Sequence, residues 1–512
     1  MGTRRDFIKL VMLGSGATYA LGVSGCRKPG EMRLLASPKR THATPQFQVA
    51  HAYLRDRAPL PAPYKTESCD VVIVGAGLSG LTAAVELERQ GKRVILVESE
   101  SRPGGAGVQA DLAGGRIPLG NVYFVERTEA LDSLIRFGGV EPVICPPDGY
   151  DLGRGEVVRD LWTDETLDRV ISNDTERDGM KRFRDQIVGL GDNVPAYPLE
   201  NSLTPELASL DVSAEEWIKG FKSQTLLTVL NSYSRSSMGA LLLRTNIYCL
   251  QNFYSGELGS NLNADRFTFP GGPGALTKAV GDRLTCQRLD HVCVRVTQDE
   301  RSAQVDCVDE SGKVVRFTAS QVIMASQKFQ APYLIPDMPT SQVAACKALS
   351  YAPYMTLHIV SDVPLTESDV YDTWNLTSEF ETDVVNPGSV PGMNLSKHVS
   401  SLFVPMDEFA RGQLQNPELF ARRSADIIER FVGTRTPEQQ ASIREVYCWG
   451  WGHGLVIPTP GSHSGIAQAA SARHGRIHFA NTDCDAAPAI ENACYHGLRA
   501  AQDVGTWEDG RS

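Results

Sequence analysis

Residues 70–80 read Asp-Val-Val-Ile-Val-Gly-Ala-Gly-Leu-Ser-Gly, an apolar run that leads directly into the pattern GxGxxG. The run predicts a buried strand, and the apolar spacing that follows predicts a helix over about residues 78–90. A second strand is predicted over residues 93–97, which completes the start of a βαβ unit. Gly75 permits the tight turn, Gly77 lets the backbone approach a pyrophosphate, and Gly80 lets helix and strand pack closely. The stretch therefore predicts a dinucleotide-binding domain.

The residues around the glycines narrow the choice of dinucleotide. Leu78 and Ser79 open the helix, whose free N–H groups and positive dipole end would face the phosphates. Glu98 closes the second strand 18 residues after Gly80, where a carboxylate binds ribose hydroxyls. This carboxylate argues against a 2′-phosphate, so NADP is not expected as the tightly held cofactor. FAD and NAD remain open at this point.

The sequence after Glu98 carries a resemblance to a flavoprotein superfamily. A short basic turn with Arg102 leads to the pair Gly104-Gly105. A Pro-Gly-Gly turn follows at 270–272, and a strand and helix over 475–501 come last. Over about residues 66–505 the order of these motifs resembles that of the amine oxidase, phytoene desaturase and protoporphyrinogen oxidase superfamily. The resemblance implies FAD as the cofactor and not NAD.

The resemblance also implies roles for further residues. In that pattern the pair Gly104-Gly105 lets the backbone run close to the pyrophosphate and ribityl chain. Val292 falls where the superfamily places a backbone contact to adenine. Asp483 would touch the ribityl chain or the pyrophosphate, and the helix that contains Asn492 and Ala493 would point at the isoalloxazine. Together with Arg102 and the motif residues, these are the predicted cofactor-binding positions.

Shorter stretches at 47–56, 351–354, 451–453 and 479–483 are similar to bacterial spermidine dehydrogenase-like flavoproteins. The chain also departs from the superfamily pattern. Ala106-Gly107 follows the glycine pair, where amine oxidases have Arg. The strand after Ala352 has no lysine at the position that the superfamily places near flavin N5. A lysine-held water that activates oxygen is therefore not expected.

An aromatic stretch at residues 447–454, Tyr-Cys-Trp-Gly-Trp-Gly-His-Gly, comes before the closing strand. Glycines between bulky rings let the rings approach a flat ligand. We expect Trp451 and His453 to line a substrate pocket at the flavin face, with Tyr123 on the opposite wall as the third candidate catalytic residue. The alternatives are a core turn with buried aromatic rings, a structural histidine and a core tyrosine. Either Tyr495 or His496 on the last helix is expected to contact flavin.

Composition limits the remaining function classes. The 512 residues are 42% apolar and 22% charged, which is typical of a globular protein. The net charge of −11 is opposite in sign to the basic charge that is typical of nucleic-acid-binding proteins, so no nucleic-acid partner is expected. The cysteines show no metal-ligand spacing, so no metal site is predicted. Most are expected to be small buried side chains, with a bridge between Cys286 and Cys293 as the alternative.

The N-terminus resembles an export signal. Arg4 and Arg5 precede an apolar run from Leu10 to Val23, as in the twin-arginine route. The run ends Val-Ser-Gly-Cys, which resembles a lipobox and predicts a lipid anchor at Cys26 as the only contact with a membrane. We expect a periplasmic or cell-envelope protein. The alternative is an ordinary signal sequence in which Cys26 is incidental.

The predicted fold is α/β, with a discontinuous Rossmann-like FAD-binding domain and an α+β substrate-binding domain. Helices are expected at 214–221, 225–243 and 417–431 and from about Pro488, a β-meander over 292–325, and strands at 354–361, 399–404 and 476–480. The expected parts are a signal (1–26), a tether and arm (27–66), FAD-binding segments (67–150, 266–330 and 466–512) and substrate-domain segments (151–265 and 331–465).

The predicted activity is that of an exported FAD-dependent oxidoreductase. It would oxidise the C–N bond of an amine or polyamine by hydride transfer to flavin N5, and the electron acceptor would be oxygen or a redox partner. One alternative is a desaturase of hydrophobic C–C substrates. Another is a non-catalytic, flavin-loaded electron-carrier lipoprotein. A narrow acidic entrance would favour a polyamine, a wide apolar entrance a lipid-like desaturase substrate, and the absence of any cavity at the flavin the carrier.

Overall fold

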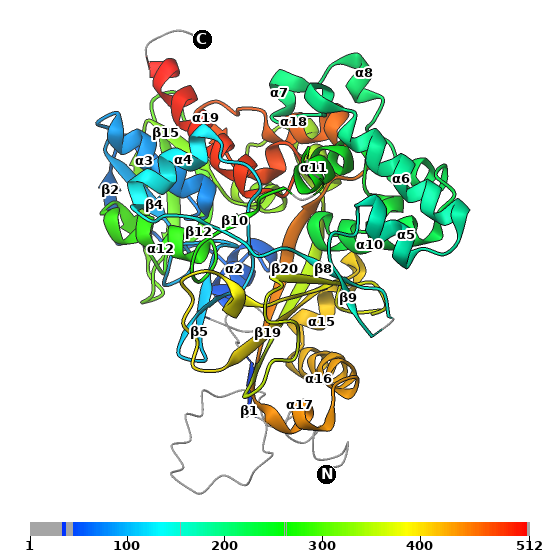
Figure 1. The fold of residues 1–512 in the computed structure, drawn as a ribbon. Helices are drawn as coiled ribbons and strands as arrows, with labels where there is room; N and C mark the ends of the chain where they lie inside the picture. The colour runs from blue at the N-terminus through cyan, green and yellow to red at the C-terminus, as the bar shows by residue number, and fades with distance from the viewer. Residues whose placement is uncertain (1–32, 37–44, 154, 261, 263, 509–512) are drawn as a thin grey trace, which may run out of the picture.

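The computed structural model describes residues 33–36, 45–153, 155–260, 262 and 264–508 (Figure 1). The predicted signal at 1–26, with Cys26, lies outside the described residues. Over the described part of the chain, no helix has the length and apolar character needed to cross a membrane.

A five-stranded parallel sheet forms the nucleotide-binding half. Its order is β11 (Gln287–Arg288), β4 (Val94–Val97), β3 (Val71–Val74), β15 (Gln321–Met324) and β21 (Ile477–Phe479). Val71 and Ile73 of β3 pack in a core with α3 (Leu78–Arg89), α4 (Glu129–Gly138), α12 (Gly274–Arg283) and α19 (Ile490–Glu508). Val72 and Val74 pack on the other face. Burial on both faces explains the continuous apolar run, and the predicted strands and helix of the βαβ start are confirmed.

A four-stranded sheet covers that second face. It contains β12 (Val292–Gln298), β13 (Ala303–Val308), β14 (Val314–Ala319) and β2 (Lys65–Ser68). The prediction that residues 322–325 continue this meander is wrong, because β15 leaves it and pairs in parallel with β3 and β21. The bridge between Cys286 and Cys293 is also absent: all ten described cysteines are free, and Cys293 lies opposite Cys307.

An eight-stranded sheet forms the other half. Its order is β1 (Arg33–Ala36), β20 (Ile443–Ile457), β16 (Ser350–Ser361), β19 (His398–Pro405), β18 (Asp383–Val385), β17 (Asp372–Asn375), β8 (Gly149–Asp151) and β9 (Val157–Val158). On one face Met355, Leu357 and Ile359 pack against Phe420 and Ile427 of α16 (Pro417–Gly433). The alternate residues Tyr354 and Thr356 face the interior of the molecule, where they line a cavity.

A group of helices packs beside this sheet, on the right of Figure 1. It comprises α5 (Asp164–Val170), α6 (Asp174–Val188), α7 (Leu199–Ser202), α8 (Pro205–Ala208), α9 (Ala214–Lys219), α10 (Gln224–Met238) and α11 (Ile247–Leu258). Helix α10 ends five residues before the predicted Leu243, because Gly239 takes a left-handed conformation with φ +80°. Helix α19 begins at Ile490, just after the predicted start at Pro488.

Shorter elements complete the chain. They are α2 (Pro45–Ala50), β5 (Gln109–Leu112), β6 (Gly115–Pro118), β7 (Val143–Ile144), β10 (Phe267–Thr268), α13 (Ala331–Leu334), α14 (Thr340–Ala348), α15 (Gly412–Gln415), α17 (Pro437–Ser442) and α18 (Ala467–Ser471). The five strands of the nucleotide sheet thus come from three separate parts of the chain. The exact domain boundaries stay a prediction.

Candidate active site

A cavity of about 670 Å³ lies at the carboxyl ends of the parallel strands. Val74 ends β3, Val97 ends β4 and Ala325 follows β15, and all three line it. Ligands of open parallel sheets bind in this position, at the carboxyl ends of the strands.

Glycine backbones form the floor of this cavity. Gly75 has φ +105°, a conformation that L side chains rarely adopt. A Cβ on Gly80 would stand 1.9 Å from the Gly75 oxygen, and one on Gly105 would stand 3.0 Å from the Gly77 Cα. Gly77 is the N-cap of α3 and offers no side-chain cap. The first-turn N–H groups of α3 are therefore free of a capping side chain, as an anion site requires.

The Glu98 carboxylate organises the loops beside that floor. It is 8% exposed and accepts hydrogen bonds from the Ala76 N–H at 2.8 Å and the Glu100 N–H at 3.0 Å. It also accepts one from the Ser99 hydroxyl at 3.0 Å. Glu98 thus ties the end of β4 to the glycine turn while lining the cavity.

The structure brings most of the predicted cofactor-binding residues to this one cavity. Those that line it are Gly75, Gly77, Leu78, Ser79, Glu98, Gly104, Gly105, Val292 and Ala493. Their contacts with a cofactor stay predictions. Three other predicted residues, Gly80, Arg102 and Asp483, are not in the lining, and Asn492 lines a neighbouring cavity.

The residues outside the lining have identifiable structural roles. Gly80 packs α3 against the glycine turn, as its spacing predicted. Arg102 donates to the Gln109 carbonyl at 2.6 Å and lies over the Trp449 ring. Asp483 is 1% exposed and accepts hydrogen bonds from the Lys328 N–H at 2.8 Å and the Tyr351 hydroxyl at 2.6 Å.

Sequence reasoning missed part of the cavity wall. Asn481 and Thr482, directly before Asp483, line the cavity in its place. Six residues of the N-terminal arm also line it: Gln46, Phe47, Ala50, His51, Leu54 and Arg55. Gln46 fixes the arm by donating to Asp290 at 2.9 Å. The sequence signal for this wall is the stretch 47–56, which carries the similarity to spermidine dehydrogenase-like flavoproteins.

A second cavity of about 830 Å³ adjoins the first. Both cavities are lined by Ala106, Asn121, Trp451, Gly454, Leu455, Pro488, Ala489 and Ile490. None of these shared residues carries a charge. Trp451 is 7% exposed, and its indole N–H donates to the Leu119 carbonyl at 2.9 Å. Trp451 therefore stands fixed at the boundary between the two cavities.

The other two candidate catalytic residues lie on different sides of that boundary. His453 lines the first cavity and stacks on Phe329, with ring centroids 3.8 Å apart. Burial, with the charge of Arg411, lowers the pKa of His453 to about 3, so its imidazole is neutral at pH 7. Tyr123 lines the second cavity and donates to Glu257 at 2.8 Å. The structure thus places Trp451 between them.

Acidic side chains dominate the second cavity. The acidic residues in its lining are Glu126, Glu129, Glu257, Asp372, Asp383 and Glu491. Among the described residues, no Lys, Arg or His lines it. Aromatic rings fill much of the remaining wall, including Tyr233, Tyr354 and Trp374. No motif in the sequence contains the acids Glu257, Asp372 and Asp383.

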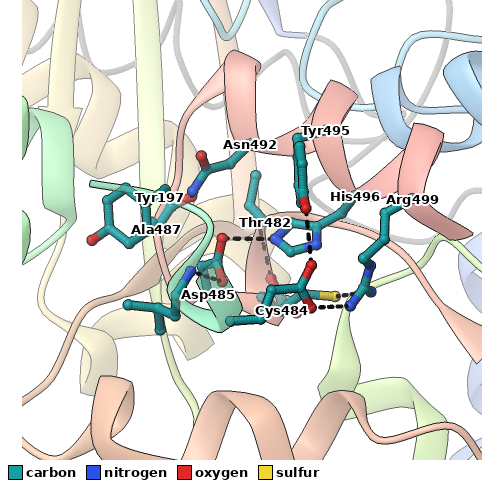
Figure 2. Close-up of polar contacts among 12 residues, drawn as sticks. Tyr197, Thr482, Cys484, Asp485, Ala487, Asn492, Tyr495, His496 and Arg499 are labelled. Carbon is teal, nitrogen blue, oxygen red and sulfur yellow. Dashed lines mark hydrogen bonds and ion pairs between the residues drawn. The ribbon is translucent and has the colours of Figure 1, made fainter. Parts of the chain in front are cut away.

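Helix α19 contributes Tyr495, His496 and Arg499 to a group of polar contacts, which Figure 2 shows. Tyr495 lines the cavity and donates to Glu200 at 2.9 Å. His496 is 1% exposed, with its Nε2 2.7 Å from Asp485 Oδ2. One of these two residues is predicted to contact flavin, but the lining of the first cavity contains neither Tyr495 nor His496. Arg499 donates to Glu200 and to the Phe479 carbonyl.

The sequence profile of the family described as flavin containing amine oxidoreductase matches residues 78–505. The chain belongs to this family. A Mycobacterium tuberculosis protein provisionally named a flavin-containing monoamine oxidase is 25% identical over 472 residues, which cover 85% of this chain and 96% of that protein.

Two solved amine oxidases share the fold of this amine oxidoreductase. A putrescine oxidase bound to putrescine superposes with a TM-score of 0.68 at 20% identity, over 86% of this chain and 100% of that one. The cyclohexylamine oxidase of Brevibacterium oxydans gives the same TM-score, identity and coverage.

The protein is an FAD-dependent oxidoreductase, and its first cavity fits this cofactor. The uncapped start of α3 and the bare Gly77 and Gly105 would accommodate the pyrophosphate. Glu98 would bind the ribose hydroxyls. Trp451 and the start of α19 would border the flavin ring where the second cavity begins.

Proposed function

We propose that this flavoenzyme oxidises the C–N bond of an amine or polyamine at the boundary between the two cavities. The observation that carries the proposal is the second cavity, which has six acidic and no basic residues in its described lining. FAD, when bound, supplies the chemistry by accepting at N5 a hydride from the carbon next to the amine nitrogen. The resulting imine is then hydrolysed by water to a carbonyl compound and an amine.

The residues of the chain would divide the work of binding. The acids attract an ammonium group into the cavity. The uncharged wall around Trp451 favours a neutral amine at the reacting end. The neutral form is the reactive one, because an ammonium cannot give up a hydride from its neighbouring carbon. Trp451 would fix the orientation of the substrate, since its indole is held by the Leu119 carbonyl. His453 would be a neutral wall residue because its pKa is lowered to about 3.

The two alternatives are less well supported. A desaturase of hydrophobic substrates needs an apolar cavity, and buried carboxylates are costly in such a site. An electron carrier needs no cavity of about 830 Å³ beside its flavin. Similarity in fold to putrescine and cyclohexylamine oxidases also favours an amine. Kinship with spermidine dehydrogenase-like flavoproteins is part of the proposal, and residues 47–56 and 479–483 support it.

The test is anaerobic reduction of the flavin. The purified, flavin-loaded protein is mixed with diamines, polyamines and monoamines, and the absorbance of the flavin band is followed. Bleaching by an amine supports the proposal, and re-admitting air then separates an oxidase from a dehydrogenase. A flavin that dithionite reduces but no amine reduces would contradict it, and hydrophobic desaturation substrates would be tested next.

Export is a separate proposal that rests on the sequence of residues 1–26. We propose that the paired arginines direct the folded protein to the twin-arginine route and that Cys26 becomes lipidated. Replacing Arg4 and Arg5 by lysine should keep the protein in the cytoplasm. Replacing Cys26 by serine should release it from the membrane fraction, and cell fractionation with immunoblotting reads out both effects. Membrane-bound C26S protein would contradict lipidation.

A further inference from the structure

Two carboxylates occupy diagonal positions on neighbouring strands of the sheet that borders the second cavity. Asp372 is on β17 and Asp383 is on β18, and both line the cavity. In the antiparallel register Trp374 lies opposite Asp383 and Asp372 opposite Val385. Residues opposite each other, and those two apart on one strand, share a face. Asp372, Trp374 and Asp383 therefore point to the same side of the sheet.

Asp372 has a buried oxygen with no partner. The residue is 1% exposed, and its Oδ1 has no hydrogen-bond partner among the described residues. Burial and the nearby charges of Asp383 and Asp148 raise the pKa of Asp372 well above its ordinary range. A buried acceptor left without a donor is unfavourable. Its position in the cavity lining points to a donor that a ligand would bring.

Asp383 is held in place by hydroxyl groups. It is 3% exposed and accepts hydrogen bonds from the Ser236 hydroxyl at 2.7 Å and the Thr382 hydroxyl at 2.5 Å. Ser236 is also 3.1 Å from the Tyr354 hydroxyl. Both hydroxyl donors bind the same oxygen, Oδ1. They fix the carboxylate without supplying a positive charge.

The nearby cations are already engaged. Arg266 is 6% exposed, forms an ion pair with Asp148, and lies 3.6 Å from Glu257. Arg235 donates to the Phe380 carbonyl at 3.1 Å. Over the described part of the chain, neither Asp372 nor Asp383 has an ion-pair partner. Arg266 and Arg235 act on the two carboxyls only from a distance, so among the described residues the pair has no directly bonded counter-charge.

The two ends of the cavity call for different protonation states in a ligand. The wall shared with the cofactor cavity is uncharged and suits a neutral amine. The Asp372 and Asp383 end offers carboxyl oxygens, one of them without a donor, and suits an ammonium with its three N–H donors. Resting on the proposed function, we propose that Asp372 and Asp383 form a subsite for the distal ammonium of a diamine or polyamine substrate. The substrate would react at its other, neutral end.

The experiment compares a matched pair of amines. Anaerobic flavin reduction by the holoenzyme is followed with 1,4-diaminobutane and with 1-aminobutane, which differ by one amino group. We expect the diamine to half-saturate the reduction at a concentration at least tenfold lower. In Asp372→Asn and in Asp383→Asn this advantage should fall to less than threefold, while reduction by the monoamine changes little. Glu310→Gln, which removes an exposed acid that lines neither cavity, is the control and should keep the full advantage.

Two results would overturn the subsite. One is equal half-saturation by the diamine and the monoamine in the unaltered enzyme. The other is a weakening of both amines to the same degree in Asp372→Asn. The flavin content and melting temperature of each variant identify a folding defect, in which case Asp383→Asn decides.

A binding measurement separates the subsite from the proposed function. The oxidised holoenzyme is titrated calorimetrically with 1,4-diaminobutane, with and without Asp372→Asn. If no amine reduces the flavin, the proposed function fails. Saturable binding that Asp372→Asn weakens at least tenfold would still support the subsite. The absence of such binding would overturn it.

Discussion

The cofactor cavity and the substrate cavity are made of different parts of the polypeptide. The floor of the first is formed by backbone, through Gly75, Gly77 and Gly105 and the start of α3. The second is formed by single side chains, such as Glu257 on α11, Asp372 on β17 and Tyr354 on β16. A backbone site requires glycine at fixed spacings, whereas a side-chain site requires only that distant residues meet. The first kind is therefore readable in a sequence and the second is not.

The substitution with the largest expected effect, Gly80→Ala, disrupts the glycine turn of the cofactor cavity. Gly80→Ala would place a methyl group 1.9 Å from the Gly75 oxygen, so α3 must move away from the glycine turn. We expect at least tenfold less FAD per protein after purification, measured by absorbance. Gly433→Ala is the control, because its Cβ would meet nothing within 4 Å. Normal flavin content in Gly80→Ala would show that the close packing is not required.

The second prediction concerns the support behind the cofactor cavity. Asp483→Ala would leave the Lys328 N–H and the Tyr351 hydroxyl buried without their acceptor. We expect the free energy of unfolding to fall by about 2–4 kcal/mol, measured by denaturant titration. The exposed Asp503→Ala should change it by less than about 0.5 kcal/mol. Equal effects of the two substitutions would contradict this role.

The third prediction sharpens the comparison through pH, because the side-chain site contains an aspartate whose charge changes near neutral pH. Burial raises the pKa of Asp383 to about 7, so it is neutral below pH 7 and anionic above. The preference for 1,4-diaminobutane over 1-aminobutane should rise about five- to tenfold between pH 6 and pH 8, measured by flavin reduction. The groups that face Asp383 or act on its charge are Ser236, Thr382, Tyr354, Asp372, Asp148 and Arg235. A flat preference would exclude Asp383 as the titrating group.

The same shift has a consequence for stability without substrate. The ordinary pKa of an aspartate is 3.8, so the raised value means that folding favours the neutral form. This contribution is fully present below pH 3.8 and is lost as the pH rises through 7. In our proposal the diamine binds the anionic form of Asp383. Adding the diamine at pH 8 should therefore raise the melting temperature more than adding it at pH 6.

The smallest expected effect lies at the outer wall of the substrate cavity. Tyr495→Phe removes the hydrogen bond to Glu200, which Arg499 still contacts (Figure 2). We expect a loss of about 0.5 kcal/mol in the free energy of unfolding. His496→Leu, one residue further, should cost about 3 kcal/mol because it leaves Asp485 buried without its partner. Denaturant titration of both variants would test the contrast, and equal losses would contradict it.

Much of the cofactor site could be predicted from local sequence. The strand, the turn and the helix at 71–89 lie together in the chain, and each glycine has a local reason. The assignment of residues 322–325 to the meander failed because strand pairing is not local. The run Gln-Val-Ile-Met lacks the alternation of β12, and that difference was a usable signal of a strand buried on both faces.

The acids of the substrate cavity could not be found in the same way. Glu257, Asp372 and Asp383 are separated by many residues, and an isolated acid in a sequence is most often an exposed one. Asp383 does precede Val384 and Val385 in a strand, so an acid beside an apolar pair was a weak signal. Only the register of β17 with β18 brings Asp372 and Asp383 together.

The order of strands in the nucleotide sheet also limits when the cofactor can bind. The sheet contains β3 from Val71 onwards, but its edge strand β21 begins about 400 residues later at Ile477, and the helix α19 follows it. Thr482 and Ala493, which line the cavity, are therefore synthesised long after the glycine turn. A growing chain on the ribosome has no complete flavin site until α19 has been made, so the cofactor cannot be bound by the first βαβ unit as it emerges.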